Sequence, residues 1–155
     1  MTELEPPGSS VIGRAAELDA LERLIERTRH GTAGAVIVGE PGIGKTTVWE
    51  AGVALARERG FRTLVSRPAR ADATLPLGSF GDLFRDISTE ELAPLPQLQR
   101  RALEVALLIE EDRGETADQR LLAVATVSLL RALATAQAPL LLALDDVQWL
   151  DESSA

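Results

Sequence analysis

The residues best suited to chemistry in this sequence form one glycine-rich run, Gly39-Glu40-Pro41-Gly42-Ile43-Gly44-Lys45-Thr46. The run follows the phosphate-binding pattern G-x-x-x-x-G-K-[ST]. Glycines let the backbone turn tightly, so that successive N–H groups approach the α- and β-phosphates of a nucleotide. Lys45 is the only lysine of the chain, and its compact ammonium suits the β- and γ-phosphates. The chemistry predicted here is the binding of a nucleotide.

The residues on either side of this run support the same prediction. The Thr46 hydroxyl is placed to bind Mg²⁺, and Thr47 follows it at the start of a helix predicted over residues 47–59. The dipole at the N-terminus of that helix attracts the same anion. The alternative is a glycine-rich turn that binds nothing, but the buried-type run Ala35–Val38 before the loop is the context that phosphate binding requires. Residues 39–47 are therefore the predicted contacts of ATP.

Two aspartates form a second group of candidate residues. Asp145 and Asp146 come directly after the apolar run Leu140–Leu144, which is typical of a buried strand in a parallel sheet. Ligands of open α/β sheets bind outside the carboxyl ends of the strands, where the glycine-rich loop also emerges. We expect Asp145 to hold Mg²⁺ together with Thr46, and Asp146 to orient or deprotonate an attacking water. The alternative is that both aspartates only end a strand at the protein surface.

Short apolar runs alternate with helical patterns along the chain. Strands are predicted over residues 35–38, 61–66 and 140–144, and helices over residues 15–29, 47–59, 82–87, 98–109 and 116–136. Capping boxes are predicted at Ser88 with Glu91 and at Thr116 with Gln119, and residues 67–81 are predicted to form a loop. Because the strands are apolar on both faces, the pattern predicts an α/β fold with a parallel sheet covered by helices on both sides.

Composition limits the classes of function. The chain has 155 residues, 45% of them hydrophobic, no cysteine and a net charge of −8. The acidic balance argues against a sequence-independent grip on nucleic acid or on an anionic membrane surface. The lack of cysteine excludes disulfides and thiolate metal sites. Residues 1–10 are acidic and rich in Pro, Gly and Ser, which predicts a flexible lead-in without a signal peptide, so we expect a soluble cytoplasmic protein.

These residues resemble a known family of ATPases. Residues 39–46 resemble a Walker A motif and residues 140–146 a Walker B motif. Residues 11–18, Val-Ile-Gly-Arg-Ala-Ala-Glu-Leu, resemble the N-terminal hhGRxxE element, and residues 144–151, Leu-Asp-Asp-Val-Gln-Trp-Leu-Asp, resemble the LDDxxWxD extension. Together they resemble the AAA-type ATPase domain of the STAND class, as found at the N-terminus of large LuxR-type transcriptional regulators. The resemblance covers nearly all of the chain from Val11 onward.

The resemblance implies a P-loop NTPase fold of the ASCE type, with the strand order 5-1-4-3-2. It also implies that Val11, Ile12, Gly13 and Arg14 lie beside the adenine and ribose of the nucleotide. The alternative for Val11 and Ile12 is that they only anchor the following helix. Residues 11–155 are then expected to be the N-terminal part of the ATPase domain, ending after the Walker B motif with the later strands of the sheet missing.

The function that the resemblance implies is an ATP-dependent switch. ATP or ADP would bind with Mg²⁺, and the full-length protein would hydrolyse ATP. Little or no turnover is expected from this segment, because the arginine finger and the sensor residue would lie further along the chain. We expect this segment to contact neither nucleic acid nor a membrane. Contact with DNA, through further modules, and self-association are expected only of the full-length protein. Two alternatives stay open: a P-loop phosphotransferase, and a truncated scaffold that binds no nucleotide.

The incomplete sheet leads to a first testable prediction. Parallel strands need both faces buried and both edges paired, so a missing central strand exposes apolar surface and unpaired backbone groups. Unless the strands over residues 35–38 and 140–144 pair directly, we expect the isolated chain to be marginally stable or prone to aggregation. Thermal unfolding, with the oligomeric state measured on the same sample, checks this. A cooperative transition of a monomer would contradict it.

Overall fold

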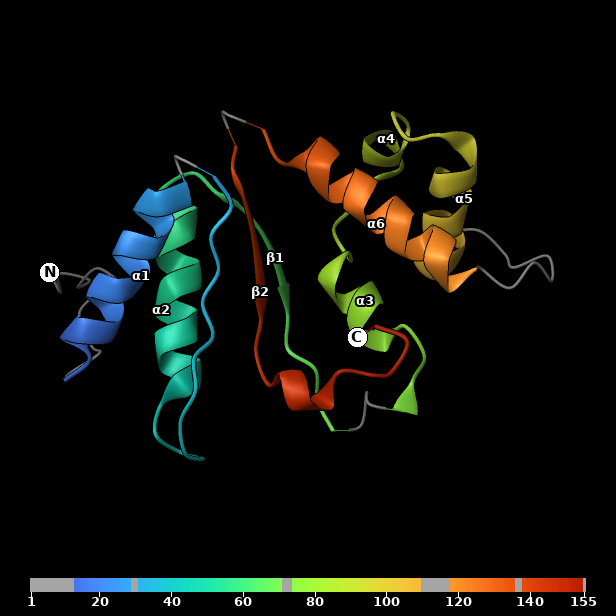
Figure 1. The fold of residues 1–155 in the computed structure, drawn as a ribbon. Coiled ribbons are helices and arrows are strands. Elements are labelled where there is room, and N and C mark those ends of the chain that lie inside the picture. Colours follow the sequence, from blue (N-terminus) through green and yellow to red (C-terminus); the bar gives the residue numbers. More distant parts are fainter. Residues whose placement is uncertain (1–12, 29–30, 71–73, 110–117, 136–137, 155) are drawn as a thin grey trace, which may run out of the picture. The chain divides into compact units, whose positions relative to one another are not determined.

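The computed structural model describes residues 13–28, 31–70, 74–109, 118–135 and 138–154 (Figure 1). The chain divides into two compact units, which we call the loop unit, residues 1–60, and the sheet unit, residues 61–155. The predicted lead-in, the residues Val11 and Ile12, and the predicted cap Thr116 lie outside the described residues. In the described part of the chain, none of the helices has the length and apolar character that a membrane span requires.

Two helices form the body of the loop unit. Helix α1 spans Ala15–Arg27 and helix α2 spans Lys45–Glu58, and the two lie side by side (Figure 1). The approach is close at Gly52, where an added Cβ would lie 3.1 Å from the Cδ1 atom of Leu21. A residue without a Cβ at this point of α2 lets the two helices pack closely. The packing holds α1 against the helix that follows the glycine-rich loop.

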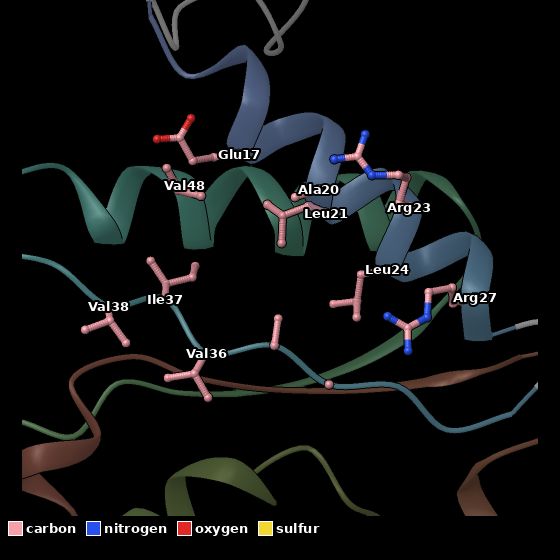
Figure 2. A pocket seen from close by; sticks show the side chains of 12 residues that line it. Glu17, Ala20, Leu21, Arg23, Leu24, Arg27, Val36, Ile37, Val38 and Val48 are labelled. Carbon is pink, nitrogen blue, oxygen red and sulfur yellow. The ribbon is translucent and has the colours of Figure 1, made fainter.

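The prediction of a strand over residues 35–38 is wrong. The sheet in the described residues contains two strands, and this segment is neither of them. Val36 and Val38 are 85% and 86% exposed, while the half-buried side chain of Ile37 points toward the helices (Figure 2). A strand forms only when a neighbour pairs with its N–H and C=O groups, and the described residues of the loop unit provide no such neighbour.

The sheet unit contains a two-stranded parallel sheet. Strand β1 spans Arg62–Ser66 and strand β2 spans Leu140–Leu144, in a register that pairs Arg62 with Leu140 and Ser66 with Leu144. Both strands lie where the sequence predicts them. Their adjacency agrees with the implied order 5-1-4-3-2, in which the second and third strands are neighbours. The observed fold is therefore α/β, with a parallel sheet and helices.

In the described part of the sheet unit, four α-helices pack beside the sheet and form a core with it (Figure 1). They are α3 over Gly78–Leu83, α4 over Thr89–Leu92, α5 over Gln97–Ala106 and α6 over Gln119–Leu133. The most deeply buried large side chains of this core are Phe84, Leu92, Leu103 and Leu129. Leu64 of β1 is buried among them, but Leu142 and Leu144 of β2 are 43% and 36% exposed. Within the sheet unit, the helices therefore cover Leu64 of β1 more fully than Leu142 and Leu144 of β2.

The helix ends confirm one of the two capping predictions. At the start of α4 the capping box of Ser88 and Glu91 is present, with the Ser88 N–H donating to Oε2 of Glu91 at 2.9 Å. Helix α6 begins after Asp118, whose Oδ1 accepts from the backbone N–H of Arg120 at 2.9 Å. This helix therefore starts later than residue 116, and an aspartate caps it.

The helix predicted over residues 82–87 is misplaced. The observed helix α3 begins at Gly78, inside the segment that the sequence predicts to be the loop 67–81. The N–H groups of Leu77 and Ser79 donate to the carboxylate of Asp151, which is 74 and 72 residues away in sequence. A carboxylate that accepts the first N–H groups of a helix fixes where the helix starts. Because this partner is distant in sequence, the local pattern does not reveal it.

The core of the sheet unit makes a prediction about stability. We expect Leu103→Ala to lower the free energy of unfolding by about 2–5 kcal/mol, because the side chain is fully buried. Leu98→Ala on the same helix is the matched control, since Leu98 is 72% exposed. Its effect should stay below about 0.5 kcal/mol. Denaturant titration of both variants measures the difference, and equal losses would contradict the assigned core.

Candidate functional site

The glycine-rich loop, residues 39–46, leads directly into helix α2. Gly42 and Gly44 have φ angles of 78° and 92°, in the left-handed region that other residues avoid. At Gly39, an added Cβ would lie only 3.0 Å from the Cγ2 atom of Ile43. The backbone path therefore favours glycine at positions 42 and 44, and at position 39 glycine leaves room for the Ile43 side chain. The loop ends where the free N–H groups and the dipole of a helix attract an anion.

Lys45 is the first residue of α2, and its ammonium lies against the start of the loop. The Nζ atom donates hydrogen bonds to the carbonyl oxygens of Gly39, at 3.0 Å, and Glu40, at 3.1 Å. Thr46 and Thr47 follow in the first turn of the helix and are exposed. The loop therefore brings together one ammonium, several backbone N–H groups and an exposed hydroxyl, which are the groups that bind a phosphate and its metal ion.

Arg14 lies beside the same loop. Its Nη1 atom donates to Oε1 of Glu17 at 2.8 Å, and its Nη2 atom donates to the carbonyl oxygen of Ile43. The hydrogen bond from Arg14 lowers the pKa of the Glu17 carboxyl. Gly13 is exposed and has a φ of 84°. The structure thus places Arg14 on the backbone of the loop, a contact that the sequence did not predict.

Asp145 continues the backbone pairing of the sheet by one residue. Its N–H donates to the carbonyl oxygen of Ser66 at 3.1 Å, beyond the end of β2. Its Oδ1 atom accepts the N–H of Asp146 at 3.0 Å. The carboxylate therefore stands at the carboxyl end of a strand whose backbone is fixed, as the sequence predicts. One carboxylate at this position offers the oxygen ligand that Mg²⁺ prefers.

Asp146 has an unusual backbone conformation. Its φ and ψ angles are both 46°, and it precedes the short 3₁₀ helix η3, Val147–Trp149. Left-handed conformations of residues other than glycine are uncommon and cluster at functional sites. The Nε2 atom of Gln148 donates to Oδ1 of Asp146 at 2.8 Å. This hydrogen bond fixes the carboxylate that we predict to act on the attacking water, and Gln148 is a residue that the sequence reasoning missed.

Asp151 is the second residue that the sequence reasoning missed. The side chain is only 2% exposed, and its carboxylate accepts from the N–H groups of Leu77, Ser79 and Ser154 and from the Ser154 hydroxyl, at 2.6–3.1 Å. Burial raises the pKa of the Asp151 carboxyl, but these hydrogen bonds outweigh burial, so the pKa is lowered overall. The carboxylate joins the segment after β2 to the start of α3. Its signal in the sequence is its place in the LDDxxWxD extension.

Trp149 lies at the end of η3 and is half-buried. The guanidinium carbon of Arg70 lies 5.7 Å from the centroid of its ring, a distance that allows a cation–π contact. Arg70 belongs to the segment that follows β1, so this contact joins the segments after the two strands.

The described structure holds the predicted site residues in two groups. Gly13, Arg14 and residues 39–47 belong to the loop unit, and Asp145 and Asp146 belong to the sheet unit. That the two groups meet at the edge of one sheet stays a prediction. Within the described ranges, no three His, Asp or Glu side chains gather as a ligand set for a metal ion.

A groove of about 570 Å³ lies in the loop unit, between helix α1 and residues 34–38 (Figure 2). Apolar and charged side chains line it, among them Leu21, Leu24, Ile37, Glu17, Arg23 and Arg27. The glycine-rich loop is not part of its walls. The groove is therefore distinct from the predicted phosphate-binding loop.

A glycine-rich loop that opens a helix, in a chain whose parallel strand ends in aspartates, is the arrangement of a P-loop nucleotide-binding protein. The comparison with known families makes this more specific. Residues 10–155 match the family model of the AAA ATPase domain, so the chain belongs to this family. No curated protein and no solved structure matched the chain in the corresponding comparisons.

AAA ATPase domains bind ATP with Mg²⁺, and the residues present fit both. At Gly39 an added Cβ would lie 3.0 Å from the Cγ2 atom of Ile43, and Lys45 is held against the residues that begin the loop. Thr46 and Asp145 each offer an oxygen, which suits a hard cation such as Mg²⁺. The backbone of the loop thus suits the phosphates of ATP, and the oxygen atoms of Thr46 and Asp145 are of the kind that Mg²⁺ prefers.

Asp151 makes a prediction about stability and pH. Because its pKa is lower in the folded than in the unfolded state, the carboxylate contributes stability above about pH 4, and the contribution is lost as the pH falls through the folded pKa. Asp151→Asn should lower the free energy of unfolding by about 1–3 kcal/mol near neutral pH. The difference in the free energy of unfolding between Asp151→Asn and the wild type should become smaller as the pH falls below about 4.

The control for this prediction is Asp86→Asn, which changes an exposed carboxylate of the same unit. Its effect near neutral pH should stay below about 0.5 kcal/mol. Denaturant titrations from about pH 7 to about pH 3 test both variants. A gap between Asp151→Asn and the wild type that stays constant over this range would show that the carboxylate charge does not stabilise the fold.

Proposed function

We propose that this chain is the ATP-binding part of a STAND-type switch, of the kind that large LuxR-type transcriptional regulators carry. The observation that carries the proposal is the glycine-rich loop, which turns at Gly42 and Gly44, holds Lys45 and runs into helix α2. Membership of the AAA ATPase domain family supports it. What supports the STAND class is the resemblance of the two flanking elements, residues 11–18 and residues 144–151, to the motifs of that class.

In this proposal the residues of the loop unit hold the nucleotide. The backbone of residues 39–47 and the ammonium of Lys45 bind the phosphates of ATP or ADP, and Gly13 and Arg14 belong to the same site. Thr46 and Asp145 hold Mg²⁺, which neutralises phosphate charge when it is bound. Asp146 orients or deprotonates the attacking water, held in place by the amide of Gln148. The chain itself thus supplies binding, orientation and one general base.

A switch of this kind does not depend on fast hydrolysis. A ligand shifts a conformational equilibrium by its difference in affinity for the two states, so ATP and ADP need only favour different arrangements. We therefore propose slow turnover and an output that comes from further modules, such as DNA-binding ones. The net charge of −8 is consistent with a segment that does not itself contact nucleic acid. We place the protein in the cytoplasm, where ATP is abundant.

The proposal is tested by the binding of a fluorescent ATP analogue in the presence of Mg²⁺. Lys45→Ala should weaken binding at least about tenfold, because it removes a charge-assisted contact to the phosphates. Arg59→Ala is the control, since it removes an exposed positive charge at the other end of the same helix. It should leave the affinity within about twofold of the wild type.

Removal of Mg²⁺ separates the phosphate contacts from the metal contacts. The wild type should lose affinity when EDTA is added, and Thr46→Ala should lose most of this dependence on Mg²⁺. Binding by Lys45→Ala that equals the wild type would refute a nucleotide site in the glycine-rich loop. A folded wild type that binds no ATP would instead support the scaffold alternative.

A further inference from the structure

Arg14 makes contacts that membership of the family does not explain. One end of its guanidinium binds Glu17 at 2.8 Å, and the other end donates to the carbonyl oxygen of Ile43, 29 residues away in sequence. The Arg14 side chain is only 29% exposed. We infer that Arg14 is a positioning residue of the phosphate-binding loop, a clamp held by Glu17 that shapes the loop before any nucleotide binds.

The carbonyl that Arg14 holds decides where the next N–H group points. In a planar trans peptide, the C=O of one residue and the N–H of the next point in opposite directions. Holding the Ile43 carbonyl toward Arg14 therefore directs the N–H of Gly44 away from it. Gly44, with its φ of 92°, has a backbone that is free to rotate when nothing restrains it. The clamp supplies that restraint from outside the loop.

An arginine is the side chain that this geometry requires. The guanidinium is planar and carries donors on separate nitrogens, so it can bind a carboxylate and a carbonyl at the same time. Its Nη2 atom lies 3.6 Å from the place where a Cβ of Gly44 would stand, which puts the guanidinium against the backbone of that glycine. Lysine has the same charge, but all its donors lie on one nitrogen, so it cannot bind the Glu17 carboxylate and the Ile43 carbonyl from two separate nitrogens as the guanidinium does.

The clamp and the predicted contact with adenine make different predictions. A residue that contacts the base affects only ligands that have a base, whereas a residue that shapes the loop affects every ligand with a polyphosphate. A clamp also orders the loop when no ligand is present. The affinity part of this inference rests on the proposed nucleotide site, but the order of the free loop does not depend on it.

The first experiment measures backbone ¹⁵N order parameters in the nucleotide-free chain. In the wild type, Ile43 and Gly44 should be about as rigid as the neighbouring helix, near 0.85, and in Arg14→Ala they should fall below about 0.6. Arg14→Lys should show the same loss, and Glu17→Gln a smaller one. Arg23→Ala is the matched control, because it removes an exposed arginine of α1, the helix that Arg14 precedes, without touching the loop. The amides of α1 report whether each variant keeps that helix.

The second experiment compares the affinities of Mg-ATP and of magnesium tripolyphosphate, which has no base. Arg14→Ala and Arg14→Lys should weaken the binding of both ligands about fivefold to tenfold, and Arg23→Ala should change neither. If the Arg14 variants lose affinity for ATP but not for tripolyphosphate, and the order parameters of the nucleotide-free loop do not change, the clamp is overturned in favour of the adenine contact. Loop disorder in Arg14→Ala that appears only together with disorder of α1, and not in Arg14→Lys, would also overturn it.

The two experiments keep this inference separate from the proposed function. If the wild type binds neither ATP nor tripolyphosphate, the proposed function fails, and the order parameters alone decide the clamp. If Lys45→Ala abolishes binding while both Arg14 variants keep a rigid loop and full affinity, the proposed function stands and the clamp is refuted.

Discussion

A loop that binds phosphate through backbone N–H groups must turn these groups toward one point, although their positive ends repel one another there. Glycines make the turn sterically available, but they contribute no side chains to hold it, so the loop depends on its surroundings for its shape. Here the surroundings are helix α2, which continues the loop, and Arg14, which holds the Ile43 carbonyl. Close packing of α1 on α2 at Gly52 keeps Arg14 within reach.

The segment after β2 must also hold a fixed backbone, but its predicted site residues are carboxylates and not N–H groups and an ammonium. Asp145 and Asp146 need a fixed backbone, yet Asp146 has the left-handed conformation that only its context can enforce. The context comes from Gln148, which binds the Asp146 carboxylate, and from Asp151, which is buried and tied to the start of α3. In both units a charged side chain outside the Walker-type motif binds backbone groups, and so holds the segment in which the predicted site residues lie.

The sequence predicts the features that depend only on residues close together along the chain. Strands β1 and β2, the glycine-rich loop and the capping box of Ser88 are local patterns, and each is present. Residues 35–38 have the apolar character of a strand, but a strand also needs a partner, which local character cannot supply. Helix α3 begins where Asp151 accepts its N–H groups, and Arg14 binds a carbonyl 29 residues away. Both depend on contacts that no local pattern encodes.

A net charge of −8 repels a polyanion such as ATP at long range. The overall charge acts over distance, however, and at physiological ionic strength it is screened within about 8 Å. The ligand that reaches the loop interacts mainly with groups in contact with it: the N–H groups, the helix dipole and Lys45. The chain has no other lysine, and its arginines are spread among carboxylates. The sequence therefore contains no second cluster of positive charge that would attract ATP. The net negative charge of the chain therefore disfavours anions at long range, and anion binding rests on the short-range contacts at the loop.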